Sequence, residues 1–148
     1  MVDEMAYHKY NANDKDGYAQ RGTQSEILVK DILIDLGYDI KDTTLLENKK
    51  GKDLYVNGYA ADVKRRSSKK CFIEVKVNNK PGWLYKDSTY IIFHFYDIDY
   101  LYICKTEDLR MLYELNDYKS CGRKEYNEEL FVLPLDDLFN ITKKIIKV

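Results

Sequence analysis

The segment that most constrains the fold is residues 53–64, Asp-Leu-Tyr-Val-Asn-Gly-Tyr-Ala-Ala-Asp-Val-Lys. An Asn-Gly pair between alternating residues is the strongest short-range signal for a β-hairpin with a two-residue turn. Such a turn pairs Val56 with Tyr59 and, three positions further out, Asp53 with Asp62. Opposed residues in a strand pair lie on the same face of the sheet, and successive residues alternate between the faces. The hairpin is therefore expected to have one apolar and one charged face.

The charged face of this hairpin favours a bound cation. The apolar face is predicted to carry Leu54, Val56, Ala61 and Val63, and the charged face to carry Asp53, Tyr55, Asp62 and Lys64. Two carboxylates opposite each other in a strand pair destabilise it. A divalent cation between them would remove the conflict, and hard oxygen ligands suit Mg²⁺, which keeps several waters and binds phosphate oxygens. Lys64 could then orient the attacking water and stabilise charge on a phosphate.

A further strand is predicted at residues 71–77, Cys-Phe-Ile-Glu-Val-Lys-Val, because apolar residues alternate there. If Ile73 and Val75 share the apolar face of the hairpin, Glu74 lies on the charged face. A short loop around residues 67–69 would place Glu74 opposite Asp62. Four or five charged groups would then converge on one patch.

These residues together resemble the PD-(D/E)XK nuclease superfamily, in particular its small phage and restriction-type members. The resemblance covers residues 23–105: Asp53, an Asp-Val-Lys sequence at 62–64 across a hairpin, and a preceding helix that carries Glu26. It implies an α+β, restriction-endonuclease-like fold with a central mixed β-sheet and flanking helices. It also implies hydrolysis of phosphodiester bonds with Mg²⁺ (or Mn²⁺) as cofactor. By this resemblance Asp53 matches the first acid, Asp62 the second acid, Lys64 the lysine and Glu26 the helix acid.

A second acid-x-Lys sequence, Glu74-Val-Lys76, leaves another register open. Asp62 and Lys64 are preferred, because the Asn-Gly turn fixes their geometry relative to Asp53. In that interpretation Glu74 is an additional catalytic acid, and the expected metal ligands are Asp53, Asp62 and Glu74.

The distribution of charge suggests a nucleic-acid partner. The net charge of the 148-residue chain is only −1, but residues 49–86 contain eleven Lys and Arg against three acids, about +8, which leaves about −9 elsewhere. Such asymmetry indicates a surface that faces nucleic acid, with DNA expected first. The alternative is a set of solvated loop lysines. The expected phosphate contacts are Arg65, Arg66, Lys69, Lys70 and Lys76.

The remaining pattern predicts an N-terminal arm at residues 1–22 and a single nuclease-like domain at 23–148. A capping box at 23–26 and a glycine at position 37 delimit the first helix. Later elements are expected as strands at 38–44, 89–96, 101–104 and 131–133, a helix capped by Thr106 through Leu115, a polar loop at 116–129, and a C-terminal helix from Asp136 to the final Lys-Lys-Ile-Ile-Lys.

The three cysteines have no Cys-x-x-Cys spacing and predict neither a disulfide framework nor a zinc site. Cys71 and Cys104 lie in apolar runs and are expected to be packed thiols. A reduced, cytoplasmic location follows, together with no signal peptide and no membrane contact. A homodimer is compatible with this interpretation.

Three functions compete at this point. The first is a metal-dependent deoxyribonuclease, encoded by a phage or mobile element. The second is a non-catalytic nucleic-acid- or protein-binding module on the same fold, and the third is a structural or inhibitory protein. His8 and His94 have no partner by spacing and are not assigned to the site. Trp83 is expected to be a core aromatic after a turn, with base stacking as the alternative.

Overall fold

The computed structural model describes residues 18–148, and the predicted arm up to residue 17 lies outside them. In this part of the chain the larger sheet contains, in spatial order, β1 (Ile40–Asp42), β2 (Leu54–Val56), β3 (Tyr59–Arg66), β6 (Tyr90–Phe95), β7 (Tyr100–Lys105) and β9 (Thr142–Lys147). A smaller sheet contains β5 (Lys80–Pro81), β4 (Cys71–Val77) and β8 (Glu129–Leu133). The helices are α2 (Tyr18–Asp35), α3 (Leu45–Lys49), α4 (Thr106–Leu115) and α5 (Leu135–Ile141), with 3₁₀ turns η1 (Trp83–Tyr85) and η2 (Lys124–Tyr126).

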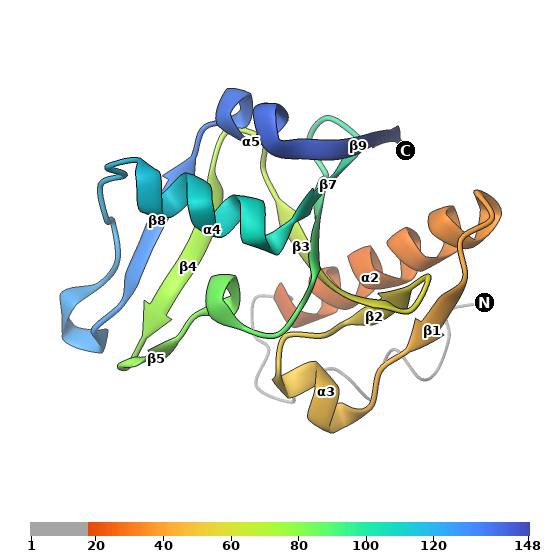
Figure 1. Cartoon of the computed structure of the whole chain (residues 1–148), viewed down its shortest axis with the longest axis horizontal. Helices are drawn as coiled ribbons and strands as arrows, with labels where there is room; N and C mark the ends of the chain where they lie inside the picture. Colours follow the sequence, from red (N-terminus) through yellow and green to blue (C-terminus); the bar gives the residue numbers. More distant parts are fainter. Residues whose placement is uncertain (1–17) are drawn as a thin grey trace.

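The architecture is α+β with a central mixed sheet and flanking helices, as the sequence predicts. The larger sheet is mixed because β3 and β6 run parallel, whereas its other strand pairs are antiparallel. Helix α2 lies on one side of the molecule, and α4 and α5 lie toward the smaller sheet (Figure 1). None of the helices in residues 18–148 is long and apolar enough to cross a bilayer.

Helix α2 begins at Tyr18, five residues earlier than its predicted start. Thr23 is therefore a buried residue inside the helix and not its N-cap. The residues at 19–21, Ala-Gln-Arg, are good helix formers, and the glycine that follows weakens a helix without ending it. The end of α2 is as predicted: Gly37 has a φ of +93°, a conformation that glycine adopts at little cost.

The predicted hairpin is confirmed in register and turn type. Leu54 pairs with Ala61, and Val56 pairs with Tyr59. Asn57 and Gly58 have φ values of +49° and +85°, as a turn that matches the right-handed twist of the strands requires.

The residues of β3 alternate between two hydrophobic cores. Ala61 and Val63 pack against α2 in the first core, the α2-side core, whose other buried members are Val29, Leu33, Leu54, Ile92, Leu101 and Ile146. Asp62 and Lys64 lie on the opposite face of the sheet, where the neighbouring strand β6 buries its aromatic residues. The second core, the intersheet core, lies between the two sheets and includes Leu109 of α4 and Leu138 of α5.

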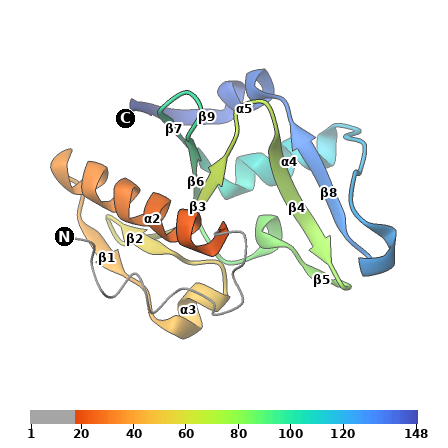
Figure 2. The same cartoon turned by 180° about the vertical axis from the view of Figure 1, so that it is seen from behind.

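The predicted pairing of β4 with the hairpin is wrong. Strand β4 pairs with β5 and β8, and the backbone pairing found near β3 within residues 18–148 is an isolated bridge between Ser67 and Lys70, in the loop that joins β3 to β4. Figures 1 and 2 show β3 and β4 joined at one end and diverging from there. Ile73 and Val75 pack in the intersheet core, whereas Val63 packs against α2. The alternation in β4 was recognised, but its partner strand comes from residues almost sixty positions later.

Two further predictions about the later elements are corrected. The C-terminal helix ends at Ile141, and the basic tail forms strand β9, which pairs with β7 and buries Ile146 in the α2-side core. The β-branched residues of this tail suit a strand, and a non-local partner decides the outcome. Thr106 is the first residue of α4 and not its cap, since the N-cap is Lys105.

Two of the cysteines are buried, as expected. Cys71 and Cys104 lie in the intersheet core, where burial raises the pKa of each thiol to about 12. Within residues 18–148 all three cysteines are free thiols, and Cys121 is exposed.

Candidate active site

Asp53 is fixed by four hydrogen bonds with three neighbouring segments, one of them from Thr43 Oγ1 to the Asp53 carbonyl oxygen at 3.2 Å. It lies one residue before β2, and its backbone N donates to the Ala61 carbonyl at 2.8 Å. Its carboxylate Oδ2 accepts from the Val63 backbone N at 2.7 Å, and Oδ1 accepts from Asn48 Nδ2 at 3.0 Å. The structure therefore places Asp53 beside the Asp62-Val-Lys64 sequence and not beside the competing Glu74-Val-Lys76.

Asp62 is a buried carboxylate with an unsatisfied oxygen. It is 2% exposed, and its Oδ2 accepts no hydrogen bond in the described structure. Lys64 Nζ lies 3.3 Å from this oxygen, within ion-pair distance. Burial raises the pKa of Asp62 well above its usual range; the charge of Lys64 opposes this shift, and the nearby Asp53 carboxylate adds to it. The predicted group of two carboxylates and a lysine is thus present on one face of the hairpin.

Trp83 lies beneath the charged residues of β3. It is 5% exposed, and its ring centroid is 5.1 Å from Lys64 Nζ and 5.9 Å from the guanidinium carbon of Arg66. A cation over the face of an indole ring is attracted to it. Trp83 is the core aromatic that the sequence predicts, and it also restricts where the Lys64 ammonium can lie.

Arg66, which the sequence predicts as a phosphate contact, also has a structural role. Its Nε donates to the Phe72 carbonyl at 3.1 Å, and Nη1 donates to the Arg65 carbonyl at 2.9 Å, so the guanidinium joins β3 to β4. Burial lowers the pKa of Arg66, and the charges of Asp62 and Glu74 oppose that shift. Two of its guanidinium nitrogens are therefore engaged within the protein.

Glu74 lies on β4, in the smaller sheet, in register with Leu130 of β8 and not with Asp62. It is half-buried, and its charge acts on the same Arg66 guanidinium as that of Asp62. No group of three or more His, Cys, Asp or Glu side chains within residues 18–148 is arranged to hold a metal ion. The predicted pairing of the Glu74 strand with β3 is wrong, because that strand belongs to the other sheet, and the role of Glu74 as a third metal ligand stays a prediction.

The two remaining predicted site residues, Glu26 and Lys76, lie on different elements, α2 and β4. Glu26 is half-buried on α2. It belongs to no group of three or more His, Cys, Asp or Glu side chains within residues 18–148 that could hold a metal ion. Lys76 is half-buried on β4, in register with Pro81 and Glu129. Neither is joined to Asp53 or Asp62 by an ion pair or hydrogen bond identified in the structure.

The basic loop between β3 and β4 is held in place by Asp97. The Asp97 carboxylate accepts hydrogen bonds from the Ser68 backbone N at 2.9 Å and from Ser68 Oγ at 2.6 Å. Lys69 and Lys70 in this loop are exposed. The guanidinium carbon of Arg65 lies 3.8 Å from the centroid of the Tyr96 ring. These three cations remain available as phosphate contacts.

The donor set suits a magnesium ion that is bound mostly by water and substrate. Mg²⁺ commonly takes one or two carboxylates from the protein and completes its coordination with waters and phosphate oxygens. Asp53 and Asp62 provide two carboxylates, and Oδ2 of Asp62, which accepts no hydrogen bond in the described structure, is an acceptor of the required kind beside Lys64. The residues therefore fit a weakly held, substrate-completed divalent cation and not a closed protein cage.

Sequence reasoning missed one residue that supports the site. Asn48 holds Asp53, and its only signal was an amide five residues before the acid in a lysine-rich segment. His94 also has a partner that spacing could not reveal, since its Nδ1 lies 2.8 Å from Ser25 Oγ. Burial, together with the charge of Arg65, lowers the pKa of His94, as is typical of a neutral core histidine.

Comparisons with protein-family models, with characterised proteins and with solved structures give no match to this chain. The family resemblance therefore rests on the sequence, in particular on Asp53, Asp62 and Lys64.

Proposed function

We propose that this chain hydrolyses phosphodiester bonds in nucleic acid, with DNA as the expected substrate, and that the reaction requires Mg²⁺ or Mn²⁺. The observation that carries the proposal is the unsatisfied oxygen of Asp62, a buried carboxylate beside a second carboxylate and a lysine. Burying a charged group without full hydrogen bonding is costly, so such an arrangement is more often functional than structural.

Each member of the site has a distinct role in this proposal. Asp53 and Asp62 would hold the cation, which would supply positive charge to the phosphate and acidify a bound water. Lys64, held by Asp62 and the Trp83 ring, would donate a hydrogen bond to a phosphate oxygen or orient the attacking water. Arg65 and the exposed lysines of the 67–70 loop would bind the backbone on either side.

The finer assignments belong to the same proposal. A restriction-endonuclease-like fold is supported by the hairpin at the site and by a helix on its apolar face. A phage or mobile-element origin, a cytoplasmic location and a homodimer are carried only by the resemblance and by the sequence patterns described above.

The test is cleavage of plasmid and of single-stranded, duplex and branched oligonucleotides with Mg²⁺, with Mn²⁺ and with chelator. Wild type should cut at least one DNA form only when metal is present, and less as salt rises. Asp62→Asn should abolish cleavage, because it removes a charged ligand while keeping the shape. Asp117→Asn, in an exposed loop, is the matched control and should cut normally. If wild type binds these substrates but cleaves none of them under any of the conditions, the proposed nuclease activity is refuted.

The second candidate is a non-catalytic module that binds nucleic acid or protein. Its support is that a third metal-binding side chain is absent from residues 18–148 and that Lys64 already partly balances Asp62. In that case wild type and Asp62→Asn would bind nucleic acid equally, and neither would cut it.

A further inference from the structure

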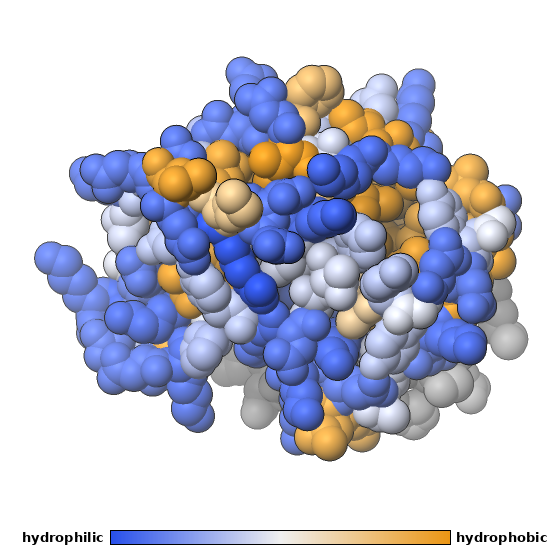
Figure 3. Space-filling model, in the orientation of Figure 1, coloured by the Kyte–Doolittle hydropathy of each residue, from blue (hydrophilic) through white to orange (hydrophobic). Residues whose placement is uncertain are grey.

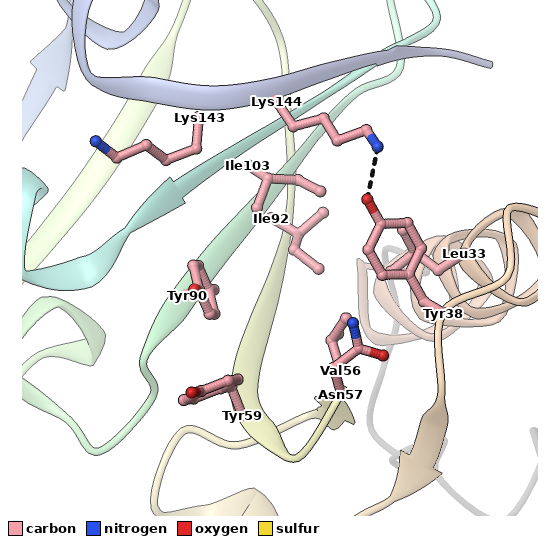
Figure 4. Close-up of a pocket in the computed structure, with 10 residues that line it drawn as sticks. All are labelled: Leu33, Tyr38, Val56, Asn57, Tyr59, Tyr90, Ile92, Ile103, Lys143 and Lys144. Carbon is pink, nitrogen blue, oxygen red and sulfur yellow. Dashed lines mark hydrogen bonds between the residues drawn. The ribbon is translucent and has the colours of Figure 1, made fainter.

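The α2 side of the larger sheet contains a hollow that the proposed active site does not use. Its volume is about 330 Å³, at the small end of the range for ligand pockets. It lies between the C-terminal end of α2, the hairpin turn and strand β9 (Figure 4), and the same face in Figure 3 exposes apolar atoms below β9. The lining residues are Leu33, Tyr38, Val56, Asn57, Tyr59, Tyr90, Ile92, Ile103, Lys143 and Lys144.

The interior of this hollow is suited to a flat apolar group. Leu33 and Ile92 are fully buried members of the α2-side core, so the floor is preformed. Tyr59 and Tyr90 form an aromatic wall, with centroids 6.0 Å apart and rings nearly perpendicular. Tyr59 is 57% exposed, which leaves much of its side chain open to a ligand. Tyrosine faces and edges pack well against other aromatic rings.

The mouth of the hollow is suited to an anion. Lys144 Nζ donates to the Tyr38 hydroxyl oxygen at 2.6 Å and lies 5.0 Å from the Tyr38 ring centroid. Because that oxygen accepts from an ammonium, its own hydrogen remains free to donate outward. Lys143, ion-paired with Asp108 at 3.5 Å, points away from the hollow in Figure 4. None of the ten lining residues is acidic.

We propose that this hollow binds a nucleotide: the base lies on the apolar floor beside Tyr59, and the phosphate lies at Lys144 and the Tyr38 hydroxyl. An aromatic wall with a cationic rim favours a planar ring that carries an anionic group over a long aliphatic chain. A free mononucleotide and the phosphorylated end of a single strand share this chemistry. The hollow lies on the opposite face of β3 from Asp62, so this site does not depend on the proposed nuclease activity.

The test is calorimetric or NMR titration of the full chain with deoxyadenosine 5′-monophosphate, with deoxyadenosine, and with a 5′-phosphorylated hexanucleotide. The monophosphate should bind at least tenfold more tightly than the nucleoside, because hydrogen bonds to charged groups are the stronger ones. If the hexanucleotide binds more tightly than the monophosphate, the ligand is the phosphorylated end of a single strand. If the two bind equally, the ligand is a free nucleotide.

The variant Lys144→Gln should weaken monophosphate binding about tenfold or more. The matched control is Lys147→Gln, which removes the same charge from an exposed position on the same strand but outside the lining. Tyr59→Ser should weaken binding of the monophosphate and of the nucleoside alike, and because Tyr59 is largely exposed, this variant should unfold at the same temperature as wild type. Absence of monophosphate binding, or equal losses in the two lysine variants, would overturn the proposal.

Discussion

Replacing Asp62 by asparagine is expected to stabilise the metal-free protein while it destroys the site. Asp62 is 2% exposed, one of its oxygens accepts no hydrogen bond, and Asp53 places a like charge nearby. Asparagine keeps a polar group at this position but removes its buried charge, which costs about 1–3 kcal/mol, whereas the lost ion pair with the partly exposed Lys64 is worth about 1 kcal/mol or less. The expected net gain is about 1–2 kcal/mol, or roughly 2–8 °C in Tm for a chain of this size.

The stability difference between Asp62→Asn and wild type should depend on pH. The pKa of Asp62 is raised in the folded state, so the folded protein keeps this proton at pH values where the unfolded chain has lost it. Stability therefore falls as pH rises from the unfolded value of about 4 through the raised folded pKa. The advantage of Asp62→Asn should accordingly be small near pH 4 and should increase with pH up to the folded pKa.

Thermal and urea unfolding of both proteins between pH 4 and pH 9, with and without Mn²⁺, would measure this effect. Mn²⁺ should stabilise only the wild type, by about 2.7 kcal/mol at one hundred times its Kd, and so remove or reverse the difference. Asp97→Asn is a control whose stability should change in the opposite direction. Burial of the Asp97 carboxylate is slight and is outweighed by hydrogen bonds from Ser68, which lower its pKa. That variant should therefore lose stability most above pH 4.

A lower stability of Asp62→Asn than of wild type at every pH would refute this reasoning. Asp62 would then be a structural partner of Lys64, and the unsatisfied oxygen would carry no functional meaning.

Four further substitutions separate chemistry, binding and folding. Lys64→Ala should reduce cleavage about 10²–10³-fold yet leave the Mn²⁺-induced rise in Tm intact, measured by initial rates and thermal unfolding. Arg65→Ala should weaken DNA binding and flatten its salt dependence, whereas Arg66→Ala should instead lower stability by about 1–3 kcal/mol in urea, because two backbone carbonyls lose a donor. Gly82→Ala should destabilise by about 1–3 kcal/mol, since its new Cβ would lie 2.4 Å from the Glu74 carbonyl oxygen.

The parts of the site that sequence could predict are those fixed by local geometry. The turn at Asn57 and Gly58 sets the register, and this register leads the chain at Asp53 toward β3, where hydrogen bonds from Val63 and Asn48 hold the Asp53 carboxylate. Glu74 was misplaced because the assignment of its strand depended on a partner, β8, that is distant in sequence and has no local signal. The helix predicted for the tail that forms β9 was wrong for the same reason, because the pairing of this tail with β7 outweighs the helical pattern of its lysines and isoleucines.

The strongest argument for function comes from comparing two strands of one sheet. Strands β3 and β6 run parallel and in register, so their side chains on the intersheet face experience nearly the same surroundings. On β6 these positions are apolar and fully buried, whereas on β3 they are charged; the pairs are Asp62 with Ile91, Lys64 with Phe93, and Arg66 with Phe95. Replacing partly buried ion pairs by apolar residues is often neutral or stabilising, so stability alone does not require the charges on β3. Arg66 is explained by its bonds between the two sheets, but Asp62 and Lys64 satisfy no comparable structural need. Their cost to the fold is most simply explained by a ligand that binds to them.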